Sequence, residues 1–126
     1  MKRLFILSVA LFVSVAAMAQ QAREVQHFAH RASRFEYDEN TLEAFQATYD
    51  KGIRGYETDI RMTGDGELVI SHDETLSRLT PSDGNVEKMT RKEISKVRTD
   101  KGNKILFADE LAKWLSKRDG VYVEWE

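Results

Sequence analysis

The sequence predicts an α/β fold built on a mostly parallel sheet. Short apolar stretches with strand character alternate with segments of helical periodicity, and this alternation is typical of βαβ units. In addition, histidine, arginine and acidic residues gather at or near the ends of the predicted strands. Functional side chains tend to lie on such strand-to-loop connections. The pattern therefore predicts both a fold class and the region of its functional site.

The first predicted unit is a strand followed by a helix. A strand over 24–29 ends at His30, and a polar loop follows it. Asn40, with Glu43 three residues later, matches the capping-box pattern that opens a helix. The apolar spacing extends this helix to Asp50.

The second half of the chain continues the alternation. A second strand is expected over 55–62, and Asp65-Gly66 is a hairpin-type turn signal before a third strand at 68–71, which delivers His72. The remaining expected elements are helices over 90–97 and 109–117, with Thr90 and Asp109 as caps, and a last strand over 121–126.

The first 19 residues match a cleavable secretory signal. Lys2 and Arg3 precede an apolar run over 4–15, and residues 17–19 fit the small-x-small rule for cleavage after Ala19. The run is too short to span a bilayer comfortably, which needs roughly 20 apolar residues; an uncleaved membrane anchor is the alternative. We therefore expect a secreted or periplasmic protein, residues 20–126, with no stable membrane anchor after cleavage.

Composition narrows the classes of function. The chain carries 19 Lys and Arg against 21 Asp and Glu, and two of the basic residues belong to the expected leader. This mildly acidic balance argues against non-specific nucleic-acid binding. The chain contains no cysteine, so disulfides and thiolate metal sites are excluded.

Three short clusters carry the chemical signal: His30-Arg31, Glu57-Thr58-Asp59 and His72-Asp73. Glu57 and Asp59 share one face of a strand, where two acids repel each other unless water or a cation neutralises them. Carboxylates suit a hard cation, an arginine suits a phosphate, and histidines move protons. This is the set of groups needed to cut a phosphodiester.

Each cluster also has a purely structural interpretation. The His30-Arg31 pair could be solvated surface, and Glu57 with Asp59 could line a solvated edge strand. His72 could be a satisfied core histidine with Asp73 as a cap. Taken singly, none of the clusters identifies an enzyme.

The order and spacing of the motifs are more specific. From His30 onward the chain resembles the glycerophosphodiester phosphodiesterase family, whose signature begins His-Arg-Gly and Pro-Glu-Asn-Thr-Leu-x-Ala-Phe. It continues with Glu-x-Asp, Thr-x-Asp-Gly-x-Leu-Val-x-x-His-Asp and Leu-x-Arg-x-Thr. The matching residues here are 30–32, 38–45, 57–59, 63–73 and 76–80.

The resemblance implies a TIM (β/α)8 barrel with its site at the carboxyl ends of the strands. It implies metal-dependent hydrolysis of a small-molecule glycerophosphodiester to glycerol 3-phosphate and an alcohol. Glu57 and Asp59 would bind Ca²⁺ or Mg²⁺, Arg31 would hold the phosphate, and His30 and His72 would be the acid/base pair.

The family's third carboxylate ligand lies in a Glu-x-Lys motif on a later strand. Here the matching strand offers Glu124 and Glu126, which point to one face, so periodicity leaves both open. Glu126 is slightly preferred, because choosing Glu124 would place Glu126 at the lysine position, which is a reversal of charge.

Two positions depart from the family pattern. Ala32 replaces a glycine, and we expect strain in the loop if this position needs a positive φ. Asp38 replaces a proline, which should loosen the approach to the helix but leave the Asn40 cap intact and have little other effect.

Length sets a further expectation. A TIM barrel typically needs ~250 residues, so residues 20–126 should hold about the first half of the barrel, with about four strands and their helices. Such a half-barrel would expose strand edges and an apolar inner face, and we expect self-association. The rival functions are a related lysophospholipase D or sphingomyelinase D-type phosphodiesterase, or a non-catalytic metal-binding remnant.

Overall fold

The computed structural model describes residues 27–126. The expected leader at 1–19 and the first part of the strand expected at 24–29 lie outside the described residues. Within 27–126, none of the helices has the length and apolar character needed to cross a bilayer.

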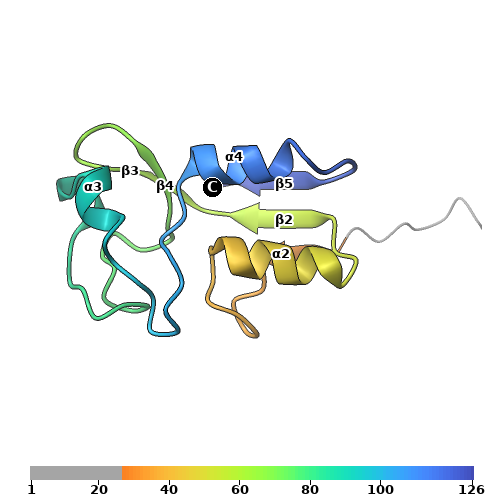
Figure 1. The fold of residues 1–126 in the computed structure, drawn as a ribbon, viewed down its shortest axis with the longest axis horizontal. Helices are drawn as coiled ribbons and strands as arrows, with labels where there is room; N and C mark the ends of the chain where they lie inside the picture. Colours follow the sequence, from red (N-terminus) through yellow and green to blue (C-terminus); the bar gives the residue numbers. More distant parts are fainter. Residues whose placement is uncertain (1–26) are drawn as a thin grey trace, which may run out of the picture.

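Three parallel strands form the main sheet, in the order β1 (Phe28–His30), β2 (Gly55–Thr58) and β5 (Tyr122–Trp125). β2 lies in the middle, with His30 on one side of Glu57 and Glu124 on the other side. Both connections return to the same sheet in the parallel sense, so the expected mostly parallel α/β fold is confirmed. Figure 1 shows β2 with β5 beside it.

Two helices cover one face of this sheet. α2 (Leu42–Asp50) and α4 (Ala108–Leu115) pack on Tyr56, which is completely buried. The Tyr56 ring lies 5.0 Å from that of Phe45 and 6.1 Å from that of Trp114, measured between centroids. Fully burying a large apolar side chain contributes roughly 1.5–3 kcal/mol, so this aromatic cluster fixes the helices on the sheet.

The opposite face of the sheet carries the polar residues and two exposed aromatic side chains. Phe28 and Tyr122 meet edge-to-face, 5.6 Å between ring centroids, on either side of Gly55. A Cβ at Gly55 would lie 2.7 Å from the backbone oxygen of His27, so a side chain does not fit there. His30 and Glu57 follow on the same face by strand alternation. The inner face expected to be apolar is therefore apolar only around Phe28 and Tyr122, and polar where His30, Glu57 and Glu124 follow.

The chain leaves the main sheet after Thr58. β3 (Ile60–Met62) and β4 (Leu68–Ile70) pair with each other in antiparallel sense and form a separate two-stranded sheet. Together with η1 (Val86–Lys88) and α3 (Arg91–Ile94), they make a lobe beyond the carboxyl end of β2, as Figure 1 shows. The lobe has its own small core, consisting of Val69, Leu76, Val86, Ile94 and Phe107.

This lobe corrects two sequence expectations. The single strand predicted over 55–62 is broken at Asp59. The hairpin turn predicted at Asp65-Gly66 is confirmed, but the two strands that it joins form a sheet of their own and do not belong to the main sheet. The main sheet therefore holds three of the expected four strands, and His72 is delivered by the lobe.

The helix starts are also partly different from the predicted ones. α2 is capped by Thr41, whose hydroxyl accepts the Ala44 amide, and Asn40 lies one residue outside with φ 57°. α4 begins after Phe107, whose N–H donates to the Glu110 carboxylate, so Asp109 is not its cap. The Thr90 cap of α3 is confirmed, although the helix ends at Ile94.

Asp38 has a larger role than its replacement of a proline suggested. Its side chain is 9% exposed, and its Oδ2 accepts from the Thr99 hydroxyl and, at 2.9 Å, from the Asn103 amide. Lys101 lies 3.4 Å from the other oxygen. This carboxylate therefore ties the loop before α2 to the segment before α4.

Replacing Asp38 by alanine should lower the free energy of unfolding. The Thr99 hydroxyl and the Asn103 amide would lose their acceptor, and an unsatisfied buried polar group costs about 1–3 kcal/mol. Urea denaturation measures the change. The exposed Asp83→Ala variant is the control and should stay within about 0.5 kcal/mol of the parent. Equal losses in both variants would contradict the tether.

Candidate active site

The site begins with an unusual loop after β1. Arg31, Ala32 and Ser33 have φ of 51°, 55° and 80°, so three consecutive non-glycine residues are left-handed. The amides of Ala32 and Ser33 donate to the Ala29 and His30 carbonyls at 3.1 and 2.9 Å. The positive φ that we expected to strain Ala32 is therefore present. The turn also directs the Arg31 amide at the Glu57 carboxylate, 3.0 Å away.

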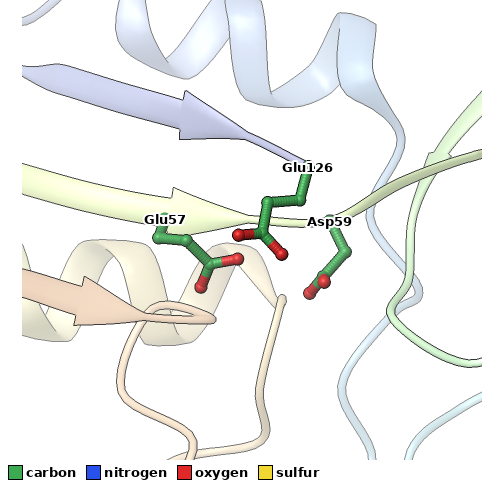
Figure 2. Close-up of side chains that lie close together, drawn as sticks. All are labelled: Glu57, Asp59 and Glu126. Carbon is green, nitrogen blue, oxygen red and sulfur yellow. The ribbon is translucent and has the colours of Figure 1, made fainter.

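Three carboxylates converge at the carboxyl end of the main sheet. Glu57, Asp59 and Glu126 each place an oxygen within 4.8 Å of the others, and Figure 2 shows the side chains pointing into one space. Glu57 and Asp59 are buried and Glu126 is exposed. The three groups come from β2, from the residue just beyond it and from the residue just beyond β5.

Backbone pairing brings Glu126 into this group. The Glu126 amide donates to the Thr58 carbonyl at 3.0 Å, and the Ile60 amide donates to the Glu126 carbonyl at 2.8 Å. These bonds continue the β2–β5 ladder and place Glu126 beside Asp59. Glu124 lies two residues before Glu126, opposite Glu57 in the ladder, and is not part of the cluster of carboxylates.

Each buried carboxylate uses one oxygen for a protein contact. Glu57 Oε2 accepts from the Arg31 amide and lies 3.5 Å from His30 Nε2. Asp59 Oδ2 accepts from Asn40 Nδ2 at 2.9 Å and lies 3.5 Å from Arg31 Nε. Glu57 Oε1 is buried and has no hydrogen-bond partner among residues 27–126. An orphaned buried oxygen beside two further carboxylates fits the all-oxygen ligand set of Ca²⁺ or Mg²⁺.

Asn40 is a site residue that the sequence reasoning missed. Its amide nitrogen holds Asp59, and its amide oxygen accepts from the Thr58 hydroxyl at 2.8 Å. The available signal was the Asn40-Thr41 pair, two cap-forming residues in succession where one helix needs a single cap. Thr41 serves as the cap, which leaves the Asn40 side chain free to reach β2.

His72 is brought near the carboxylates by the lobe. The Ser71 amide donates to the Asp59 carbonyl at 3.0 Å, and Arg61 Nε donates to the His72 carbonyl at 2.9 Å. The imidazole is partly exposed, and its Nδ1 lies 2.6 Å from Asp73 Oδ1. His30 is likewise exposed at the end of β1. Both predicted imidazoles are thus open to solvent at this end of the molecule.

Arginines favour the charged form of two further carboxylates, those of Glu39 and Asp73. Burial by itself raises the pKa of Glu39, but the hydrogen bonds and charges of Arg78 and Arg31 outweigh it and leave this pKa below its usual range. Burial also acts to raise the pKa of Asp73. The contacts with Arg78 and His72 outweigh this effect, so the pKa of Asp73 lies below its usual range. In turn, the Glu39 and Asp73 carboxylates hold the pKa of Arg78 above its usual range.

A parallel α/β sheet with acidic and imidazole groups at the carboxyl ends of its strands is the arrangement of TIM-barrel enzymes. The model of the glycerophosphoryl diester phosphodiesterase family matches residues 30–123. The chain belongs to this family.

Individual relatives agree with this assignment. The chain is 42% identical over 69 residues to a glycerophosphodiester phosphodiesterase of Caldanaerobacter subterraneus, and 36% identical over 73 residues to human glycerophosphodiester phosphodiesterase 1. These matches cover 55% and 58% of this chain, but only 28% and 22% of the relatives.

Solved structures are similar as well. A glycerophosphodiester phosphodiesterase from Agrobacterium tumefaciens superposes with a TM-score of 0.68 at 34% identity, over 78% of this chain and 46% of its own. An Oleispira antarctica phosphodiesterase, solved with the product sn-glycerol-3-phosphate, gives 0.69 at 30% identity, over 79% and 43%. The chain thus spans less than half the length of these relatives, and its fold is part of a TIM barrel of the phosphodiesterase type.

The lowered pKa values predict an acid-sensitive fold. A carboxylate with a depressed pKa stabilises the folded state above its unfolded pKa, about 4 for Asp and Glu, and this stabilisation is lost as the pH falls through the folded value. We expect the free energy of unfolding, measured by urea denaturation at pH 7, 4 and 3, to fall with acidification. Glu39→Gln should flatten this dependence, and an unchanged dependence would contradict the assignment.

Proposed function

We propose that the protein hydrolyses glycerophosphodiesters to glycerol 3-phosphate and an alcohol, with the help of a divalent cation. The observation that carries this proposal is the cluster of Glu57, Asp59 and Glu126, whose oxygens lie within 4.8 Å of one another beside Arg31 and His30. His72 follows Ser71, whose amide donates to the Asp59 carbonyl. Membership of the family supports it, and so does the product bound to the Oleispira relative.

The three carboxylates would hold Ca²⁺ or Mg²⁺. The orphaned Glu57 Oε1 and the exposed Glu126 supply oxygens for which residues 27–126 provide no hydrogen-bond donor. When bound, such an ion offsets negative charge on the phosphoryl oxygens. Asn40 and Arg31 hold Asp59 and Glu57 by their other oxygens, so the ligand atoms are oriented before any ion binds.

Arg31 is proposed to bind the phosphate. Its guanidinium is almost completely buried, and its Nε has no hydrogen-bond partner among the described residues. Nη1 is held by Glu39 at 3.2 Å. Nε lies 3.5 Å from Asp59 Oδ2, so the guanidinium sits beside the carboxylates, where its positive charge would attract a phosphate.

His30 and His72 are proposed as the acid/base pair. In this role one imidazole removes the proton of the attacking water, and the other gives a proton to the oxygen of the leaving alcohol. Exposure of both rings allows them to exchange protons with solvent between turnovers. Asp73 next to His72 and Glu57 next to His30 orient the two rings.

The two candidate third ligands give a matched test of the metal site. Glu126→Gln should raise the dissociation constant for Ca²⁺ or Mg²⁺ about 10-fold or more, because ligand loss weakens a hard-cation site. Glu124→Gln, two residues earlier on β5 and on the same face, should change it less than about twofold, since Glu124 lies outside the cluster. Titration calorimetry measures both. The reverse order would assign the site to Glu124.

The histidines are tested by activity and metal binding together. His30→Ala or His72→Ala should lower the rate of glycerophosphocholine hydrolysis by about 10²–10⁴-fold, while the affinity for the divalent ion stays nearly unchanged. Glycerophosphoethanolamine and lysophosphatidylcholine complete the substrate panel. Full turnover in both variants would refute the acid/base roles. Activity confined to lysophosphatidylcholine would instead indicate a lysophospholipase D type, and metal binding without turnover a non-catalytic protein.

A further inference from the structure

A continuous chain of alternating charges connects the two sides of the site. It runs through His72, Asp73, Arg78, Glu39 and Arg31, and we call it the Arg78 chain. Asp73 Oδ1 lies 2.6 Å from His72 Nδ1, and Glu39 Oε1 lies 3.2 Å from Arg31 Nη1. Arg78 is the link between these two pairs. None of the roles proposed above uses Arg78 or Glu39 directly.

All three nitrogens of the Arg78 guanidinium donate hydrogen bonds to carboxylates. Nε donates to Asp73 Oδ2 at 2.5 Å, while Nη1 and Nη2 donate to Glu39 Oε2 and Oε1 at 3.0 and 2.6 Å. A fork of this kind fixes both the position and the plane of its partners. The Glu39 side chain is only 5% exposed, so its buried negative charge needs the positive charges of Arg78 and Arg31 to offset the cost of leaving water.

We propose that Arg78 and Glu39 are positioning residues, which set the orientation of the His72 imidazole and of the Arg31 guanidinium through one shared ion-pair chain. This inference rests on the proposed function, because it assigns a task to the two oriented groups. Asp73, held by Arg78, accepts the Nδ1 proton of the neutral His72 ring, so that Nε2 is left for proton transfer. Glu39, held by the same Arg78, fixes the plane of Arg31.

The simpler interpretation is that Arg78 only attaches the 72–80 segment to the loop before α2. Both interpretations predict some loss of stability when Arg78 is replaced. They differ in the His72 tautomer and in the kinetic constants, because only a positioning role connects Arg78 to His72 Nδ1 and to Arg31.

Arg91 provides a matched control. It also joins two carboxylates by its guanidinium, with Nη1 at 3.0 Å from Glu67 and Nη2 at 2.9 Å from Asp109. Its side chain is 31% exposed, against 44% for Arg78. These contacts lie outside the Arg78 chain. Arg91→Gln therefore removes an arginine that bridges two carboxylates, here more exposed ones, without touching the site.

The experiment compares Arg78→Gln, Glu39→Gln and Arg91→Gln in the full chain. The imidazole ¹⁵N chemical shifts, assigned with His72→Gln, report the tautomer of His72. The kinetic constants are measured with glycerophosphocholine, and urea denaturation checks folding. We expect Arg78→Gln to move the His72 shifts away from the Nδ1–H tautomer and to lower kcat/KM by about 10–100-fold, through both kcat and KM.

Of the other two variants, Glu39→Gln tests the Arg31 end of the Arg78 chain, and Arg91→Gln is the control outside it. Glu39→Gln should raise KM and leave the His72 tautomer as it is, because Arg78 still holds Asp73. Arg91→Gln should leave the tautomer, kcat and KM within about twofold of the parent. If Arg78→Gln fails to fold, Asp73→Asn tests the same arm and should shift the tautomer in the same way.

Two results would overturn the inference. One is an unchanged His72 tautomer in both Arg78→Gln and Asp73→Asn. The other is a loss of kcat/KM in Arg91→Gln as large as that in Arg78→Gln. Should the parent protein bind the divalent ion but hydrolyse no glycerophosphodiester, the proposed function fails, and the tautomer measurement still decides whether Arg78 orients His72.

Discussion

The pairing of β5 with β2 is the constraint on which the candidate site depends. In a parallel ladder each residue is fixed opposite one partner, so the pair Thr58 and Trp125 dictates that Glu126 lies beside Asp59. A shift of one residue would turn the Glu126 side chain to the helix-covered face. Residues nearly seventy positions apart in the chain therefore meet because of backbone hydrogen bonds, before any side chain contributes.

That register has an electrostatic cost, which the surrounding residues reduce. Three carboxylates within 4.8 Å repel one another, and two of them are buried. Arg31 supplies a backbone donor to Glu57 and a positive charge near Asp59, and Asn40 supplies a neutral donor. One guanidinium cannot neutralise three carboxylates, and Glu39 shares its charge. The remaining negative charge is the physical reason why a divalent cation fits this end of the sheet.

Much of this architecture could be predicted from the sequence. The alternation of strand-like and helix-like segments predicted the parallel sheet, and the order of motifs predicted the family. The break at Asp59 could not be predicted, because Tyr56, Thr58 and Ile60 keep alternating across it. Ile60 continues the pattern because it still packs against the main core, although it already belongs to the hairpin. Alternation of apolar and polar residues indicates which face of a strand is buried. It does not indicate which sheet the strand joins.

Side-chain networks were predicted less well than elements, for a related reason. Asn40 was assigned to a local cap, because short-range hydrogen bonds are the ones that sequence spacing describes. Its actual partners, Thr58 and Asp59, lie on another strand. Likewise, Arg78 was recognised only as part of a motif, since its connection to Glu39 requires the lobe and the loop before α2 to fold together. Such contacts depend on tertiary structure, which spacing along the chain does not contain.

The left-handed loop after β1 shows how this arrangement tolerates an alanine where the family pattern has glycine. An L-residue in the left-handed region costs roughly 1–2 kcal/mol, and such strain persists only where the surroundings enforce it. Here the Ala32 methyl group is fully buried in the main core, and burial of one methyl-sized group contributes about 0.8 kcal/mol. Packing therefore offsets part of the strain at Ala32, and the turn still directs the Arg31 amide at Glu57 and its guanidinium at Asp59. The strained backbone lets one residue orient two of the three carboxylates.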